Sequence, residues 1–116
     1  MNISIFKGFA VNAQSIEKCK HLIEKEFAIQ FTVHESSYTG QYFKAIFLNS
    51  TLTLFNNYNE IEKEWTASEY KLLNIILSVS ISRGKKVERL DTDKIICEKL
   101  AILNFQLVSD YEKKDR

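Results

Sequence analysis

The sequence predicts an α+β fold in which two helices pack on one face of a mainly antiparallel sheet of about five strands. Two segments near the ends of the chain have helical apolar spacing, and the segments between them alternate apolar and polar residues as strands do. Most of these strands follow one another directly, which favours antiparallel neighbours. The expected order is β-α-β-β-β-β-α, in a single domain spanning residues 1–116.

The first half of the chain predicts one strand, one helix and a hairpin. Residues 3–9 begin with apolar alternation typical of a strand. A helix follows, with Asn12 or Ser15 as a suitable N-cap. Its apolar face consists of Ile16, Cys19, Leu22, Ile23 and Phe27. Residues 30–34 and 42–48, separated by a turn at residues 36–40, predict an antiparallel hairpin.

The second half predicts two more strands, and a third if residues 60–65 also form one. Residues 51–55 are the first, and residues 60–65, if they form a strand, carry three glutamates on one face. The clearest strand is residues 72–82, where alternate apolar residues point to one side. We therefore expect it at the centre of the sheet.

A long helix is expected to end the chain. Asp91 or Thr92 is the predicted N-cap, and Lys113 and Lys114 would complement the dipole at its C-terminus. The apolar stripe that predicts this helix comprises Ile96, Leu100, Leu103, Leu107 and Tyr111.

The overall charge excludes strong long-range attraction to polyanions. Sixteen basic and fifteen acidic residues give a formal net charge of +1. A short basic loop at residues 83–89 has no aromatic residue for base stacking, so we interpret it as solvated. The chain has no long apolar run, and its first residues lack a signal-peptide pattern. We therefore expect a cytoplasmic protein with neither nucleic acid nor membrane as a partner.

The motifs of common enzyme and cofactor classes are missing. Only three glycines are present, widely separated, so a phosphate-binding glycine loop is excluded. The spacings typical of zinc ligands are absent as well. We expect no metal and no cofactor, and Cys19 and Cys97 are predicted to be buried free thiols.

The best candidate for acid–base catalysis is His34 beside Glu35. Adjacent strand residues point to opposite faces, so this pair would not act on one substrate unless a bulge intervened. The other histidine, His21, is expected to contact Glu17 or Glu24 on its own helix. We therefore predict that the protein is not an enzyme and assign no catalytic residue.

An acidic and aromatic segment, residues 58–70, is the remaining chemical feature. Its four glutamates are opposed by a single lysine, and large aromatic residues lie between them. Carboxylates complement a basic partner, and tyrosine and tryptophan are common interface anchors. The predicted partner-binding residues are Tyr58, Glu60, Glu62, Glu64, Trp65, Glu69 and Tyr70. The alternative is a solvated strand face with Trp65 turned into the core.

A small neutral chain with this segment, followed by a long strand, resembles the cytosolic immunity proteins of bacterial contact-dependent growth inhibition and related toxin systems. The resemblance implies an antitoxin that binds its cognate toxin protein through a protein–protein interface. The toxin would often be a nuclease with a basic active site, and the glutamates would then occupy the place of substrate phosphates. The alternative function is a small homodimeric ligand-binding or regulatory domain, paired through a sheet edge or the face around Trp65.

Overall fold

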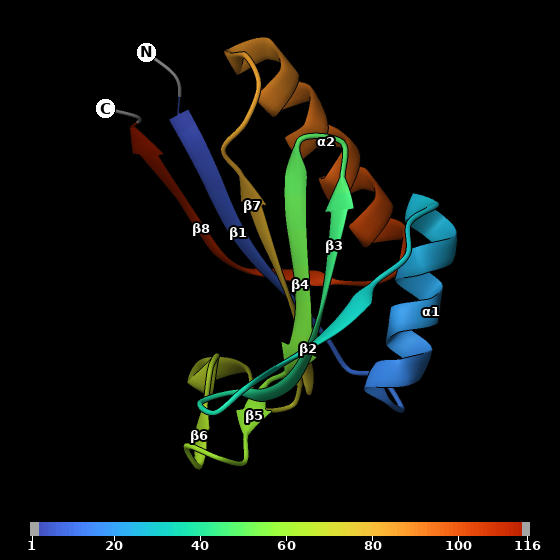
Figure 1. Cartoon of the computed structure of the whole chain (residues 1–116), viewed down its shortest axis with the longest axis vertical. Coiled ribbons are helices and arrows are strands. Elements are labelled where there is room, and N and C mark those ends of the chain that lie inside the picture. Colours follow the sequence, from blue (N-terminus) through green and yellow to red (C-terminus); the bar gives the residue numbers. More distant parts are fainter. Residues whose placement is uncertain (1–2, 115–116) are drawn as a thin grey trace.

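The computed structural model describes residues 3–114 and confirms the α+β class (Figure 1). The main sheet has six strands, more than the five expected, in the order β2-β3-β4-β7-β1-β8, and every neighbouring pair is antiparallel. A separate two-stranded sheet pairs β5 with β6. The elements are β1 (Ile3–Val11), α1 (Ile16–Phe27), β2 (Thr32–Ser36), β3 (Gly40–Phe47), β4 (Ser50–Asn56), β5 (Tyr58–Asn59), β6 (Glu64–Trp65), the 3-10 helix η1 (Ser68–Tyr70), β7 (Ile75–Ile81), α2 (Lys86–Ile102) and β8 (Gln106–Lys114).

Strand β7 lies inside the sheet, between β4 and β1, as predicted. Both helices lie on one side of the sheet (Figure 1). The side chains of β7 that belong to the core beneath them are Ile75, Leu77, Val79 and Ile81, each at most 1% exposed. Because side chains alternate along a strand, the opposite side, which we call the open face, carries Ile76, Ser78 and Ser80.

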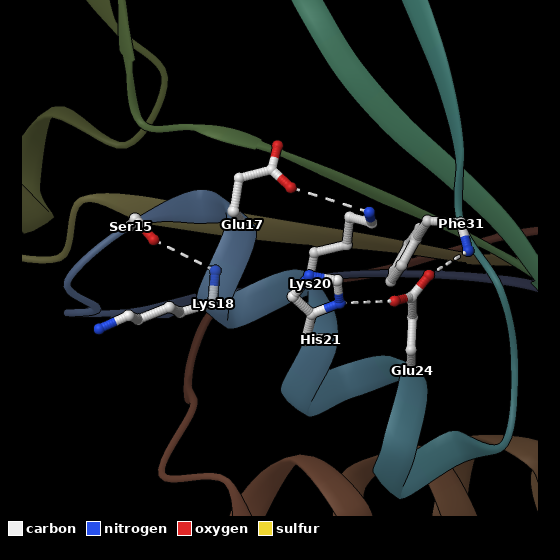
Figure 2. Close-up of polar contacts among 7 residues, drawn as sticks. All are labelled: Ser15, Glu17, Lys18, Lys20, His21, Glu24 and Phe31. Carbon is white, nitrogen blue, oxygen red and sulfur yellow. Dashed lines mark hydrogen bonds and ion pairs between the residues drawn. The ribbon is translucent and has the colours of Figure 1, made fainter.

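Helix α1 forms where the apolar spacing predicts it, and side-chain hydrogen bonds to backbone N–H groups lie near both of its ends (Figure 2). The Ser15 hydroxyl accepts the Lys18 N–H at 3.2 Å, which identifies Ser15, rather than Asn12, as the N-cap. Near the other end, the Glu24 carboxylate accepts the Phe31 N–H at 2.9 Å and lies 3.2 Å from Nδ1 of His21. The predicted contact of His21 with Glu24 is therefore confirmed.

Helix α2 begins earlier than predicted. Its N-cap is Lys85, whose backbone N–H donates to the Glu88 carboxylate at 2.9 Å. This interaction starts the helix more than a turn before Asp91, so the expected cap at Asp91 or Thr92 is wrong. Thr92 lies instead within the helix, buried, and its hydroxyl donates to the side chain of Asn49.

Helix α2 also ends much earlier than predicted. Asn104 adopts a left-handed conformation with φ of 64°. The N–H of Phe105 then donates to the Leu100 carbonyl at 3.0 Å, and that of Asn104 donates to the Ala101 carbonyl at 3.1 Å. This is the Schellman arrangement that terminates helices, and asparagine tolerates it better than most residues.

The last segment is strand β8, so the predicted continuation of the helix through Leu107 and Tyr111 is wrong. Strand β8 pairs with β1, with Leu107 opposite Phe9 and Tyr111 opposite Phe6. The backbone groups on that edge of β1 gain hydrogen-bond partners, a gain that helical spacing along the sequence does not reveal. Lys113 and Lys114 consequently lie in a strand, where they cannot complement the helix dipole.

Among residues 3–114, neither helix has the length and apolar character needed to cross a bilayer.

Glu24 makes the stability of the fold depend on pH. The Phe31 N–H, followed by the His21 side chain, holds the pKa of Glu24 below its usual value, although burial opposes the shift. A carboxyl whose folded pKa is lowered stabilises the fold above its unfolded pKa, and this stabilisation is lost as pH falls through the folded pKa. Glu24→Gln is expected to reduce the free energy of unfolding by about 1 kcal/mol at neutral pH, after allowing for solvent screening.

Urea denaturation of wild type and variant between pH 7 and pH 3 tests this expectation. The difference between the two proteins should shrink as pH falls below the ordinary glutamate pKa of about 4.3 and then through the lower folded pKa of Glu24. Glu98→Gln, at an exposed position on α2, serves as the matched control and should change stability little throughout. A difference for Glu24→Gln that is constant across pH would contradict the assignment.

Candidate partner-binding surface

Between β4 and β7 the chain leaves the six-stranded sheet, and we call residues 57–74 the excursion. It contains the β5–β6 hairpin and η1, and lies beyond the end of the sheet where β4 finishes and β7 starts (Figure 1). All the predicted partner-binding residues lie in the excursion: Tyr58, Glu60, Glu62, Glu64, Trp65, Glu69 and Tyr70.

The predicted strand at residues 60–65 is wrong. Residues 60–63 form a turn, in which Lys63 has a left-handed φ of 56°, and only Glu64 and Trp65 are in a strand. The Asn59 side-chain oxygen accepts the N–H groups of Ile61 and Glu62, each at 3.0 Å. Such a local asparagine turn competes with strand pairing, so the chain reverses here instead of extending.

The side chain of Asn57, which is fully buried, forms hydrogen bonds with backbone groups in the later part of the excursion. Its side-chain amide group lies 3.3, 3.1 and 2.9 Å from the carbonyl oxygens of Ala67, Tyr70 and Leu73, and its side-chain oxygen accepts the Ala67 N–H at 2.8 Å. The backbone of Asn57 also bonds to Thr66 and Asn74. One side chain thereby links the backbone at Ala67, Tyr70 and Leu73, and the carbonyls of Ala67 and Tyr70 also accept the N–H groups of Tyr70 and Leu73.

Two further asparagines fix the excursion to the rest of the protein. The Asn59 amide donates to the Tyr38 carbonyl at 3.0 Å, in the turn between β2 and β3. The Asn74 side chain bonds both backbone groups of Ala13, at 2.9 and 2.8 Å, in the connection between β1 and α1. The excursion is therefore positioned relative to both the hairpin and the first helix.

Tyr58 and Trp65 form an aromatic pair across the β5–β6 hairpin. Their ring centroids lie 5.0 Å apart in an edge-to-face arrangement, and the Lys71 ammonium lies 5.9 Å from the centroid of the Trp65 ring. Trp65 is half-buried and outside the hydrophobic core, while Tyr58 is 37% exposed. The alternative of a tryptophan turned into the core is thus not the observed arrangement.

The four glutamates of the excursion are exposed: Glu60, Glu62, Glu64 and Glu69. Within residues 3–114, each of them lacks a cationic side chain within ion-pairing distance, and ion pairs occur elsewhere. The lysines of the excursion are Lys63 and Lys71. The excursion therefore carries unneutralised negative charge at one end of a protein whose overall charge is nearly balanced.

Two cavities adjoin the excursion. One, of about 500 Å³, lies between the β5–β6 hairpin and the β2–β3 turn, and Tyr58, Glu60 and Trp65 line it. The other, of about 410 Å³, lies against the open face and is lined in part by Glu69 and Tyr70. We call the second one the open-face cavity. Glu62 and Glu64 line neither cavity. The predicted partner-binding residues therefore do not share one cavity: some line the first, some line the second, and these two glutamates lie on the surface outside both.

The residues that position this surface were not recognised from the sequence. Nothing in the sequence distinguishes buried Asn57 from its exposed neighbour Asn56. The signal in the sequence is a group of asparagines on both sides of a polar segment, and only the tertiary structure shows which of them are enclosed.

The other candidate residues do not gather at one site. His34 is exposed on β2, stacks on Tyr42 at 5.5 Å, and its Nε2 lies 3.0 Å from the Thr32 hydroxyl. Arg89 of the basic loop is buried, where its Nε donates to the Gly84 carbonyl at 2.9 Å. The positive charge available on that loop for phosphate contacts is correspondingly reduced.

The two cysteines differ in burial. Cys19 is buried as predicted, and burial raises the pKa of its thiol to about 11. Cys97 is only partly buried, and its sulfur lies 3.6 Å from the Lys7 ammonium, which pairs with Asp93 at 2.8 Å. Burial also raises the pKa of Cys97, so both thiols are protonated at neutral pH and are poor nucleophiles.

Within residues 3–114, groups of three or more histidine, cysteine or acidic side chains placed to hold a metal ion are absent. Comparison with known proteins adds no relative: no protein-family model and no curated protein matches the chain.

Replacing Asn57 tests whether it organises the surface. Asn57→Ala is expected to lower the free energy of unfolding by about 3 kcal/mol, because the hydrogen bonds of this buried side chain to the backbone of Ala67, Tyr70 and Leu73 are lost. Trp65 is the sole tryptophan, so its fluorescence reports directly on the excursion. We expect its emission to shift toward that of a solvated indole. Asn56→Ala, at the adjacent exposed position, should change neither quantity appreciably. Equal behaviour of the two variants would contradict the role of Asn57.

Proposed function

We propose that this protein is a cytoplasmic immunity protein, which binds the toxin protein of its own system, a nuclease, and covers the basic active site of that toxin. The observation that supports the proposal is the excursion: its four exposed glutamates make no ion pair within residues 3–114, and the buried Asn57 orders the backbone that carries them.

The hydrogen bonds of Asn57 favour tight binding of a partner, because they order the excursion before the partner arrives. Association costs conformational entropy whenever loops and side chains become ordered at an interface. An excursion closed by Asn57 and attached through Asn59 and Asn74 has little backbone freedom left to lose. Its carboxylates are therefore presented to a partner in an arrangement that already exists before binding.

The charges and rings of the excursion have separate roles in this proposal. Exposed carboxylates attract a basic surface and accelerate encounter. Tyr58 and Trp65 supply apolar area close to the glutamates, as aromatic anchors do in many interfaces. Inhibition by occlusion requires no chemical step from the inhibitor, so it is compatible with a chain in which no catalytic arrangement was predicted.

Charge reversal tests this proposal. The partner is first recovered from the native cell as a one-to-one complex with the tagged protein and is then purified. Association of Glu62→Lys/Glu64→Lys with it is expected to be at least about tenfold slower than that of wild type at low salt, and to depend less on salt, because steering by opposite charges is lost. Stopped-flow or surface-binding kinetics across ionic strength measure both effects.

The matched control is Asp91→Lys/Glu98→Lys, which makes the same change in net charge at exposed positions of α2. It should associate nearly as fast as wild type. Equal slowing by the two double variants would mean that only net charge matters, and an unchanged rate for Glu62→Lys/Glu64→Lys would refute this surface as the binding site. A recovered partner whose toxicity is not suppressed by the protein would refute the immunity function.

A homodimeric ligand-binding or regulatory domain is the second candidate, and it is favoured by the edge strand β8. This strand ends the six-stranded order and is largely exposed over nine residues. Its charged residues, Asp110, Glu112, Lys113 and Lys114, discourage pairing between copies, which makes the inhibitor the better-supported function. A molecular mass that doubles with concentration, in the absence of any second protein, would favour the homodimer.

A further inference from the structure

The open-face cavity has a small-residue floor and aromatic walls. Its floor includes Gly8 and Ser78, which are paired neighbours on β1 and β7, and Ser109 of β8. A Cβ at Gly8 would lie 2.4 Å from the Ser109 hydroxyl oxygen, so that hydroxyl would have to rotate away from a larger residue at position 8. The rings that line the cavity are Phe6, Phe55, Tyr70 and Tyr111, of which Phe6 and Tyr111 stack at 4.9 Å.

The charge around this cavity is negative. The charged residues that line it are Lys7 and Glu69. The Lys7 ammonium lies 2.8 Å from the Asp93 carboxylate of α2, on the helix-covered side of the sheet, and is therefore directed away from the cavity. Glu69 is exposed on η1 and is free of ion pairs within residues 3–114. A cation entering the cavity would meet aromatic rings and a carboxylate, without a facing positive charge.

We propose that the open-face cavity receives an arginine side chain of the basic partner, an inference that rests on the proposed function. A guanidinium ion is planar, is weakly hydrated for a cation, and stacks on aromatic rings while it donates to a carboxylate. An ammonium ion is more strongly hydrated and lacks the flat surface that matches these walls. A volume of about 410 Å³ accommodates an arginine side chain together with part of its neighbouring residue.

The experiment uses N-acetyl-arginine amide as the probe, titrated into the isotopically labelled protein and followed by NMR. The signals expected to shift are those of Gly8, Phe55, Glu69, Tyr70, Ser78 and Ser109. The matched probes are N-acetyl-lysine amide and N-acetyl-citrulline amide, the second of which has nearly the shape of arginine but no charge. Each should bind at least about fivefold more weakly than the arginine probe. Equal shifts from all three probes, or shifts spread over the whole surface, would overturn the proposal.

Two variants locate the site. Ser78→Leu, which fills the floor of the cavity, should abolish probe binding, whereas Ser80→Leu, on the same strand and face but outside the lining, should not. Glu69→Gln preserves the shape of the side chain and should weaken binding of the probe about fivefold, while Glu98→Gln, at an exposed position of α2, should leave it unchanged. Arginine binding that persists in both Ser78→Leu and Glu69→Gln would overturn the proposal.

The same variants separate this inference from the proposed function. If the cavity takes an arginine of the partner, Ser78→Leu should weaken the purified complex at least about tenfold. Probe binding at the cavity combined with a complex that is insensitive to Ser78→Leu would overturn the assignment to the partner. Probe binding in a protein that suppresses no toxin would refute the immunity function and leave the cation site established.

Discussion

The fold depends on the apolar row of β7, which must be covered on one side. Ile75, Leu77, Val79 and Ile81 are enclosed by the helices, and strands β4 and β1 satisfy both edges of β7. Since both helices cover the same face, the open face remains available, with its rings and hydroxyl groups arranged around a cavity. Because the apolar side chains on one face of the sheet must be buried under the helices, a ligand or partner can reach only the opposite, open face.

The second constraint is that buried backbone groups near the start of β7 need hydrogen-bond partners. Asn57 and Asn74 lie where β4 finishes and β7 starts, and their side chains satisfy backbone groups of the excursion and of the β1–α1 connection. A polar segment without an apolar core of its own becomes ordered because these groups are paired. The acidic turn, the aromatic pair and the two cavities all take their positions from this arrangement, so stability and the proposed recognition surface share the same few hydrogen bonds.

The elements that could be predicted are those whose apolar periodicity along the sequence agrees with the secondary structure that they adopt in the fold. Helix α1, the β2–β3 hairpin and the central position of β7 followed from apolar spacing and turn residues. Strand β8 was mistaken for a helix, because Leu103, Leu107 and Tyr111 continue a helical stripe. What ends that stripe is the left-handed conformation of Asn104 together with a vacant edge of β1, and the second of these exists only in three dimensions.

By itself, the sequence determined the class of the fold, the core face of its central strand, and the clustering of acidic and aromatic residues within residues 58–70. These properties depend on composition and short-range periodicity, which are local. The tertiary structure alone decided that Asn57 is enclosed, that the glutamates lie on a turn rather than a strand face, and that Glu69 borders a cavity against the open face. Burial and cavity shape arise from contacts between distant segments, and such contacts leave no periodic signal along the chain.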